Sequence, residues 1–175
     1  MTYCPIIEFT LDGGLPPNLT DLYLEGCKNL KCVPNTMYQL TLLQILKIPG
    51  GALTMGLQNL TSLQRLEIEQ KSPQDIVLPS SLTSLYIWDE ENLKSIPKGL
   101  FQNLSSLEEL LIVNCPKLRS LPKEAFRPSL GKLYIGSCPH LKRQRFEAKG
   151  DYWTLTRGIA RVRINGKEVI KTSVN

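Results

Sequence analysis

The pattern Leu-x-x-Leu-x-Leu/Ile recurs six times in the 175 residues of this chain, and it constrains the fold more than any other feature. Successive copies begin 24, 20, 19, 25 and 23 residues apart. A single match would carry little information, whereas six matches with one internal spacing indicate an internal repeat. The copies are Leu19, Leu22 and Leu24; Leu43, Leu46 and Ile48; Leu63, Leu66 and Ile68; Leu82, Leu85 and Ile87; Leu107, Leu110 and Ile112; and Leu130, Leu133 and Ile135.

The spacing within each copy predicts a short strand. Residues two apart share one face of a strand, so the last two apolar residues of each copy point the same way. A single copy cannot bury its leucines, and stacked neighbours bury them together. A period of roughly 20 to 25 residues is typical of leucine-rich repeats. We therefore predict an α/β fold: a leucine-rich-repeat solenoid with a parallel sheet on the concave side, a mostly irregular convex side and a small C-terminal cap.

Three of the copies share a continuation beyond the strand. A cysteine follows the last strand position by three residues, and a leucine comes three residues after the cysteine. A small side chain at this turn can point inward and offer a weak hydrogen-bond partner to backbone groups. The longer copies add an apolar residue and a proline, which fixes φ in the irregular return segment. The cysteines are Cys27, Cys115 and Cys138, and the added pairs are Val33-Pro34, Ile96-Pro97 and Leu121-Pro122.

The N-terminal residues look like the end of another repeat. Cys4-Pro5 has the same form as Cys115-Pro116 in a later turn. We therefore expect residues 1–141 to form the solenoid, with a partial first repeat and six full ones, as a piece of a longer array or a shortened product. The alternative is that residues 1–14 form an improvised cap.

The C-terminal residues 142–175 depart from the pattern and predict a cap, which repeat arrays need at their ends. A short helix is expected over residues 141–149, and Asp151 is a plausible start for a second helical turn. Asn165-Gly166 is a strong hairpin signal. We expect Trp153 to cover the last repeat.

The net charge of +5 is unevenly distributed along the chain. Residues 139–175 hold nine Lys and Arg against three Asp and Glu, whereas residues 1–138 hold twelve against thirteen. The basic excess belongs to the C-terminal segment alone, so we do not expect a nucleic-acid partner. Its cations could bind phosphate or an acidic surface, but a solvated face of the cap is the simpler prediction. They are Lys142, Arg143, Arg145, Arg161 and Arg163.

Several sequence features favour a cytoplasmic location without a membrane partner. The longest apolar runs, residues 85–88 and 110–113, are far shorter than the roughly 20 residues of a membrane span. The first seven residues contain no Lys or Arg, unlike a secretory signal. Five cysteines are an odd number that suits a reducing compartment. We therefore predict buried free thiols at Cys115 and Cys138, although adjacent repeats bring them within disulfide reach.

Particular segments resemble the C-terminal leucine-rich-repeat region of plant intracellular coiled-coil, nucleotide-binding, leucine-rich-repeat disease resistance proteins. The repeat segments are Leu15-Pro16-Pro17-Asn18-Leu19-Thr20, residues 78–85 and residues 103–118. The ending is also similar, in Cys138-Pro139-His140-Leu141-Lys142, Gly150-Asp151-Tyr152-Trp153 and residues 159–166. Two features depart from the family: Tyr152 replaces the usual acidic residue before the tryptophan, and residues 43–78 follow the pattern loosely.

The resemblance implies two roles for such a region. One is recognition of a pathogen effector or a guarded host protein, and the other is autoinhibition of the receptor's nucleotide-binding domain. The chain has no Gly-x-x-x-x-Gly-Lys phosphate loop, so the family's use of ATP is not carried over. The alternatives are a generic cytosolic leucine-rich-repeat adaptor with no immune role and, third, a secreted receptor-type array. The last lacks support because its Leu-x-Gly-x-Ile-Pro element is missing.

The strand positions between the leucines predict a partner-binding face. In a strand these side chains point away from the core and towards the solvent. Three tyrosines, a tryptophan and two aliphatic side chains are more apolar surface than scattered exposure explains. Aromatic side chains also dominate interface hot spots. The candidate partner-binding residues are Tyr23, Lys47, Glu67, Tyr86, Trp88, Leu111, Val113 and Tyr134.

We expect no catalytic residue, no metal and no cofactor. Glu67 and Glu69 share a strand face but have no nucleophile near them in sequence. His140 is the only histidine and has no partner in a triad-like spacing. Cys27 and Cys32 with that distant histidine do not make a four-ligand zinc set.

Overall fold

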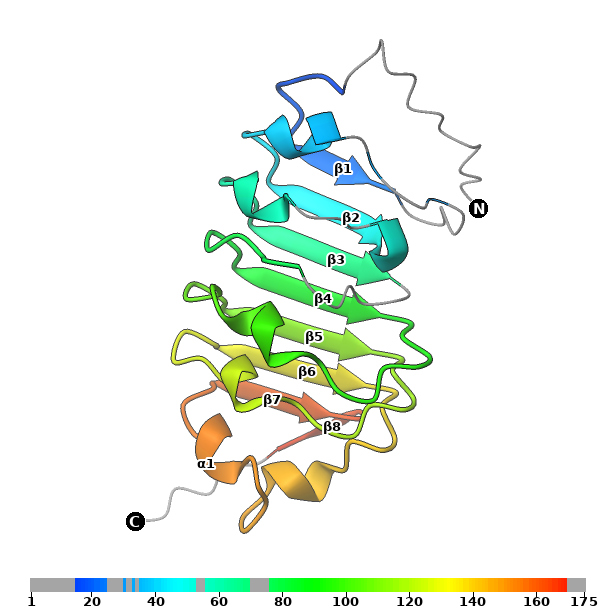
Figure 1. Cartoon of the computed structure of the whole chain (residues 1–175). Helices are drawn as coiled ribbons and strands as arrows, with labels where there is room; N and C mark the ends of the chain where they lie inside the picture. The colour runs from blue at the N-terminus through cyan, green and yellow to red at the C-terminus, as the bar shows by residue number, and fades with distance from the viewer. Residues whose placement is uncertain are drawn as a thin grey trace.

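The computed structural model describes residues 15–24, 30, 33, 35–52, 56–69 and 76–169. Within these residues the chain forms one eight-stranded sheet whose strands lie in sequence order (Figure 1). Neighbouring strands from β1 to β7 are parallel, and β8 pairs antiparallel with β7. The strands are β1 Asp21–Tyr23, β2 Ile45–Pro49, β3 Arg65–Glu69, β4 Ser84–Trp88, β5 Glu109–Val113, β6 Lys132–Gly136, β7 Arg161–Ile164 and β8 Lys167–Glu168.

The pairing register places equivalent positions of the repeats side by side, as the repeat pattern predicts. Leu85 pairs with Leu66 on one side and with Leu110 on the other, and the same holds along the sheet from β1 to β6. The inward leucines and isoleucines of β2 to β6 are almost completely buried. A slip of one residue would turn every one of them to solvent, so burial fixes the register strongly.

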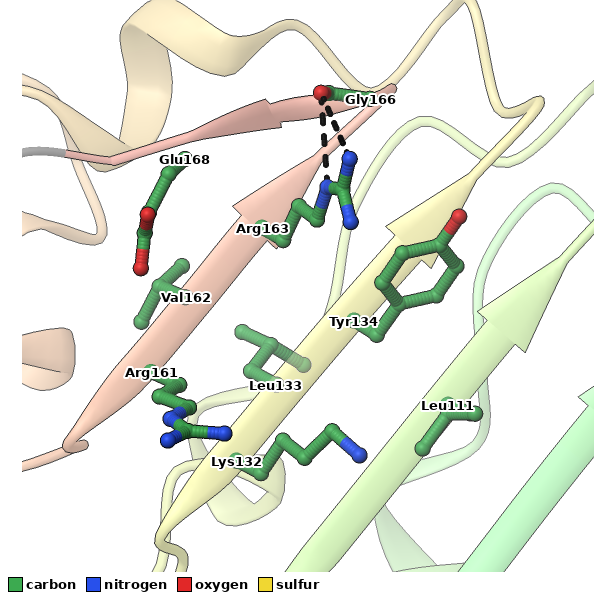
Figure 2. Close-up of a pocket in the computed structure, with 9 residues that line it drawn as sticks. All are labelled: Leu111, Lys132, Leu133, Tyr134, Arg161, Val162, Arg163, Gly166 and Glu168. Carbon is green, nitrogen blue, oxygen red and sulfur yellow. Dashed lines mark hydrogen bonds between the residues drawn. The ribbon is translucent and has the colours of Figure 1, made fainter.

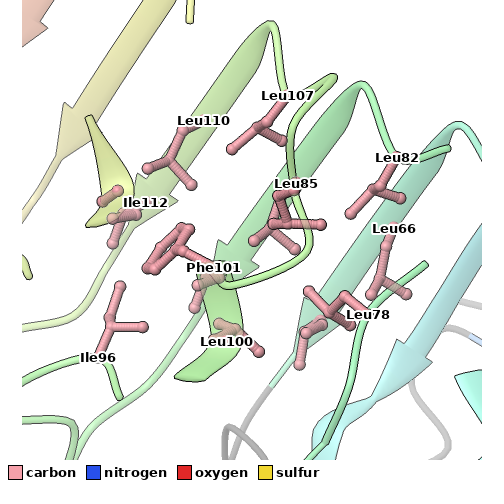
Figure 3. Packing of buried hydrophobic residues seen from close by; sticks show 14 of the residues in the cluster. Leu66, Leu78, Leu82, Leu85, Ile96, Leu100, Phe101, Leu107, Leu110 and Ile112 are labelled. Atoms are coloured by element: carbon pink, nitrogen blue, oxygen red, sulfur yellow. The ribbon is translucent and has the colours of Figure 1, made fainter. Parts of the chain in front are cut away.

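Short helical turns and irregular segments connect each strand to the next. The 3-10 helices are η1 Asn35–Gln39, η2 Gly50–Ala52, η3 Leu57–Asn59, η4 Lys98–Phe101, η5 Lys123–Ala125 and η6 Arg143–Phe146, and the one α-helix in the described residues is α1 Trp153–Thr156. Their apolar side chains close the core from the side opposite the outward strand positions. Figure 3 shows Leu78, Leu100 and Phe101 packed against the strand leucines, and Phe101 has no exposed surface.

The turns after β4, β5 and β6 use the left-handed backbone conformation. Asp89, Asn114 and Ser137 directly follow β4, β5 and β6, and their φ angles are 55°, 54° and 51°. Asn and Asp tolerate this conformation because their short side chains form local hydrogen bonds. The Nδ2 of Asn114 donates to Oδ1 of Asp89 at 2.7 Å, so neighbouring turns also support each other.

The cysteines of these turns behave as the sequence predicts. Cys115 and Cys138 are buried free thiols. Each sulfur donates to a backbone carbonyl two residues earlier, Cys115 to Val113 at 3.5 Å and Cys138 to Gly136 at 3.2 Å. Cys4, Cys27 and Cys32 lie outside the described residues.

The C-terminal segment contains the predicted hairpin, but the first strand of the hairpin also belongs to the repeat sheet. The expected hairpin is present, with Asn165-Gly166 between β7 and β8. However, β7 also pairs in parallel with β6 and so extends the sheet. The spacing of Ile159, Val162 and Ile164, all buried, repeats Leu-x-x-Leu-x-Ile with β-branched residues in place of leucine.

The expected helix over residues 141–149 is also shorter in the structure. Only Arg143–Phe146 forms a 3-10 turn, and Glu147 has an extended backbone that ends it. The residue that closes the core is Tyr152 and not Trp153, which is half-buried. Tyr152 packs against Phe126 and Phe146 at ring distances of 5.0 and 4.9 Å.

Tyr152 fills this place because of its hydroxyl. The backbone N–H of Leu121 donates to the Tyr152 hydroxyl at 2.8 Å, and the hydroxyl donates to the Leu121 carbonyl at 3.1 Å. An indole can only donate a hydrogen bond, so Trp153 could not satisfy both backbone groups.

Candidate functional site

The outward strand positions of β1 to β7 form one continuous surface, which we call the outward face. The register places its members in three rows that run across the strands. The central row is Tyr23, Lys47, Glu67, Tyr86, Leu111, Tyr134 and Arg163. The row at the strand ends is Pro49, Glu69, Trp88, Val113 and Gly136, and the row at the strand starts is Asp21, Ile45, Arg65, Ser84, Glu109, Lys132 and Arg161.

The structure brings all eight candidate residues together on this face. Tyr23 is 56% exposed, and the other seven are half-buried by their neighbours on the face. None of the eight lies in the core. The geometry therefore places the eight candidates on one surface. Glu25, which would extend the row at the strand ends, lies outside the described residues.

A ladder of polar contacts crosses the middle of the outward face. The guanidinium of Arg65 lies 5.2 Å from the centre of the Tyr86 ring. The Tyr86 hydroxyl donates to Oε2 of Glu109 at 2.5 Å, and the ammonium of Lys132 binds the other carboxylate oxygen of Glu109. Four neighbouring strands, β3 to β6, are thereby linked through side chains as well as through the backbone.

The ladder changes the ionisation of its central pair. Partial burial and the hydrogen bond to Glu109 raise the pKa of Tyr86 to about 12. Partial burial also acts to raise the pKa of Glu109, but the hydrogen bonds from Lys132 and Tyr86 outweigh it and leave that pKa below its ordinary value. At neutral pH the face therefore carries a neutral phenol hydrogen-bonded to a carboxylate.

Apolar surface surrounds the end of this ladder. Tyr86 and Trp88 meet edge to face, with ring centres 6.2 Å apart and planes at 78°. Val113 lies beside Trp88, and Leu111 lies beside Tyr86, on the next strand. The Nε1–H of Trp88 is covered and has no hydrogen-bond partner among the described residues. Fixed aromatic rings of this kind give a protein partner a large contact area at a low cost in side-chain entropy.

The outward face carries two carboxylates near β3, and a lysine of β2 is paired with them. The ammonium of Lys47 lies 3.0 Å from Oε1 of Glu69 and 3.9 Å from Oε2 of Glu67. One lysine thus contacts two carboxylates. These two glutamates form ion pairs on the face and have no catalytic partner in the contacts of the described residues.

The outward face is basic at its other end, over β5 to β7. Figure 2 shows a hollow there with Lys132 and Arg161 at one end and Arg163 beside Tyr134 at the other. Its volume is about 810 Å³. The sequence prediction was wrong to group Arg161 and Arg163 with the other cations of the cap, because β7 places both on the outward face. The spacing of Ile159, Val162 and Ile164 is the signal that could have found this.

Two other basic residues of the C-terminal segment, Arg143 and Arg145, form contacts within the cap. The guanidinium of Arg145 binds Asp151 at 2.9 Å and donates to the Arg119 carbonyl at 2.6 Å. It also lies 4.5 Å from the centre of the Tyr152 ring. Arg143 forms an ion pair with Glu147, so neither arginine is simply solvated as the sequence suggested.

Groups that could support chemistry are few in the described part of the chain. No cluster of three or more His, Cys, Asp or Glu there could hold a metal ion. The hydrogen-bonded thiol of Cys138 and burial both raise the pKa of Cys115, which keeps its sulfur protonated at neutral pH. His140 is exposed in the turn before η6. None of the helices in the described ranges is long and apolar enough to cross a membrane.

Comparison with known proteins finds relatives among plant disease resistance proteins and also a receptor-like protein. No protein-family model matches the chain. The Arabidopsis thaliana disease resistance protein At3g14460 is 30% identical over 190 aligned positions, which cover 89% of this chain and 13% of that protein. The disease resistance protein RPS6 of the same plant is 30% identical over 128 positions, 71% of this chain and 11% of RPS6. Receptor-like protein 45, also from Arabidopsis, is 28% identical over 70% of this chain and 14% of its own length.

These matches cover most of the chain but only a small part of each relative. The chain spans about an eighth of the length of At3g14460, at 13%. The similarity to disease resistance proteins covers 89% of the chain in one relative and 71% in another, and it agrees with the resemblance carried by the repeat segments and by the ending. The relatives therefore support a relationship to the plant disease resistance proteins.

Proposed function

We propose that this chain is the protein-binding leucine-rich-repeat module of a plant disease resistance receptor. In this proposal the repeats form a cytoplasmic solenoid whose concave surface is the outward face. The face recognises a pathogen effector or a guarded host protein, and it also restrains the receptor's nucleotide-binding domain. The chain acts by binding alone, without catalysis, metal or cofactor.

The observation that carries the proposal is the concentration of half-buried aromatic and aliphatic side chains at the centre of the outward face. Tyr86, Trp88, Leu111 and Val113 lie on two adjacent strands there. They are surrounded by charged residues on β3 and β6, which resembles the arrangement of an apolar interface centre with a polar rim. The 30% identity to disease resistance proteins supports an immune role for such a surface.

The mechanism follows from competition for one surface. If the nucleotide-binding domain and the recognised protein both need the outward face, only one of them can occupy it. A ligand shifts a conformational equilibrium by its differential affinity for the two states. Binding of the recognised protein would therefore release the restrained domain without any chemical step in this chain.

The proposal is tested with the variant Tyr86→Ala/Trp88→Ala. The tagged chain is expressed in leaf tissue challenged with a pathogen, and the proteins captured with it are compared with those captured by the variant. At least one captured protein should bind the purified wild-type chain directly. The variant should weaken that binding by about 2 kcal/mol or more, because truncation of central aromatic residues removes hot-spot contacts.

A matched control is available in two exposed leucines away from the face. Leu42 and Leu155 are 52% and 39% exposed and lie outside the strands. Leu42→Ala/Leu155→Ala should leave the same binding unchanged. Equal affinity of the folded Tyr86→Ala/Trp88→Ala variant and the wild type for every captured partner would reject the outward face as the binding site.

The restraining role needs its own measurement. A disease resistance protein without its repeat region is expressed in leaves with or without this chain, and cell death is scored. We expect the chain to reduce cell death and the Tyr86→Ala/Trp88→Ala variant to be less effective. If binding to a captured partner depends on the face but cell death is never reduced, the generic adaptor becomes the better interpretation.

A second candidate is a receptor-type repeat array outside the cell, which the match to Receptor-like protein 45 favours. The two candidates differ in location. A fluorescent fusion of the full-length native gene product that is retained in the cytoplasm supports the first, and delivery to the cell surface supports the second.

A further inference from the structure

We infer that the hollow over β5 to β7 binds an acidic peptide segment of the partner protein. This inference rests on the proposed function, since it assigns a chemistry to one part of the same outward face. Three cations line the hollow together with two apolar side chains of the face. The lining residues used in the argument are Lys132, Arg161, Arg163, Leu111, Tyr134 and Glu168.

The two arginines of β7 are the strongest anion-binding groups in this hollow. Arg161 and Arg163 are two residues apart on one strand, so their side chains leave the same face of the sheet. Both are exposed, and neither forms an ion pair with another described residue. Arg163 makes only long contacts of 3.4 Å from Nε and Nη2 to the Gly166 carbonyl. Both guanidinium groups therefore retain donors that a carboxylate could accept in a two-point contact.

The remaining charges around the hollow leave it weakly basic. Lys132 is already paired with Glu109, and its side chain is 49% exposed. Glu168 lies opposite Arg163 in the antiparallel pair and is the one acidic lining residue. The geometry thus favours a ligand with a small number of acidic groups that meet the two arginines.

Apolar side chains close the side of the hollow that faces the middle of the sheet. Leu111 and Tyr134 are register partners on β5 and β6, and Arg163 follows in the same row on β7. Figure 2 shows the Tyr134 ring between Leu111 and Arg163. An acidic side chain over the arginines would therefore have apolar protein surface on one side.

The spacing of the arginines suits an extended peptide. Residues two apart on a strand are separated by about 6.6 Å, and so are side chains two apart in an extended ligand. Two acidic residues separated by one other residue can then reach Arg161 and Arg163 together. Such a peptide runs along β7, and Tyr134 and Leu111 lie to one side of it.

A nucleic acid fits this surface less well than a peptide does. A phosphate backbone places negative charge at every nucleotide and requires a continuous basic track. The outward face instead turns apolar at β4 and β5 and presents Glu67 and Glu69 on β3, where Lys47 contacts both. A short acidic segment needs only the cations of the hollow.

The experiment measures binding of a fluorescein-labelled peptide, in which glutamates alternate with serines, to the full chain by fluorescence anisotropy. A second peptide has glutamine in place of every glutamate, and a third probe is a single-stranded oligonucleotide of similar length. We expect the acidic peptide to bind, the glutamine peptide to bind at least about tenfold more weakly, and added salt to weaken the acidic complex.

Variants connect the binding to the two arginines. Arg161→Ala/Arg163→Ala should lower the affinity of the chain for the acidic peptide by about tenfold or more. Lys142→Ala/Arg157→Ala removes the same charge from two exposed positions away from the outward face and should change affinity by less than about twofold. Equal binding by the glutamine peptide, no effect of the arginine pair, or tighter binding of the oligonucleotide would each overturn the inference.

Failure of this inference can be separated from failure of the proposed function. If Tyr86→Ala/Trp88→Ala weakens partner binding while Arg161→Ala/Arg163→Ala does not affect either the partner or the acidic peptide, only the inference is wrong. If the arginine pair binds the acidic peptide and no partner depends on Tyr86 or Trp88, the hollow binds acidic peptides and the proposed function is wrong.

Discussion

The hydroxyl group of Tyr152 forms two hydrogen bonds with the backbone of Leu121, accepting from its N–H at 2.8 Å and donating to its carbonyl at 3.1 Å. Both residues are 5% exposed, so no solvent replaces these bonds. The contact joins the cap to a return segment 31 residues earlier in the chain. A single side chain thus satisfies backbone groups that the sheet leaves unpaired.

Tyr152→Phe should therefore destabilise the chain although it keeps the aromatic packing against Phe126 and Phe146. A buried donor and a buried acceptor would lose their partner, which costs about 1–3 kcal/mol. Urea denaturation should show the loss as a lower midpoint with an unchanged slope. Tyr134→Phe removes a hydroxyl from the outward face and should stay within about 0.5 kcal/mol of the wild type. Equal midpoints for the two variants would contradict the role of the Leu121 contact.

The sequence predicted the sheet and its register because burial imposes one simple period. Each inward leucine must have a neighbour at the same height on the next strand, so the repeat spacing alone aligns Leu66, Leu85 and Leu110. The same reasoning aligned the candidate partner-binding residues. Their arrangement follows from the strand period of two, whereas a binding role does not follow from that period and stays a prediction.

The C-terminal segment was harder to predict for two physical reasons. The strand β7 contains Val162 and Ile164 in place of the leucine pattern, although β-branched residues fill a sheet position equally well. The choice of Tyr152 over Trp153 depends on the backbone groups of Leu121, which lie 31 residues away in sequence. Long-range hydrogen-bonding needs of this kind leave no local pattern.

Gly150 lies where the cap backbone folds tightly onto η6. A Cβ atom at Gly150 would lie 2.3 Å from the Gln144 carbonyl oxygen and 2.4 Å from that of Arg145. These are backbone atoms that cannot move without unwinding the turn. Gly150→Ala should therefore lower the unfolding free energy by about 2–3 kcal/mol.

Gly158 provides the control for this substitution, because a Cβ atom there would have no neighbour within 4 Å. Gly158→Ala should be neutral or slightly stabilising, since alanine restricts the unfolded chain. Thermal unfolding of both variants measures the difference. Similar melting temperatures for Gly150→Ala and Gly158→Ala would show that the cap backbone relaxes around the new methyl group.

Glu109 makes stability depend on pH in the acidic range. Its folded pKa is below the ordinary value of 4.5, so the charged form is favoured in the folded state. Its contribution is present above about the ordinary carboxyl pKa and is lost as the pH falls through the lowered folded pKa. The stability advantage of the wild type over Glu109→Gln should therefore shrink as the pH falls below 4.5.

Chemical denaturation of both proteins at several pH values measures this difference. Lys132→Met removes one of the three groups that lower the pKa of Glu109, and it should move the loss of stability to higher pH. A constant difference between the wild type and Glu109→Gln from neutral pH down to below 4.5 would contradict a lowered pKa in the folded chain.

Asn165 connects the stability of the hairpin to the shape of the basic hollow. Its Oδ1 accepts from the Cys138 N–H at 2.9 Å, its Nδ2 donates to the Cys138 carbonyl at 3.1 Å, and its φ is 47°. Asn165→Gly removes the hydrogen bonds but tolerates the left-handed backbone, whereas Asn165→Ala also adds strain of about 1–2 kcal/mol. We expect urea midpoints to fall in the order wild type, Asn165→Gly, Asn165→Ala.

Because Gly166 and Glu168 line the hollow, both variants should also bind the acidic peptide more weakly. Full stability of Asn165→Gly would show that the hydrogen bonds to Cys138 add nothing measurable. The left-handed backbone would then be the whole reason why asparagine is more stable than alanine at this position.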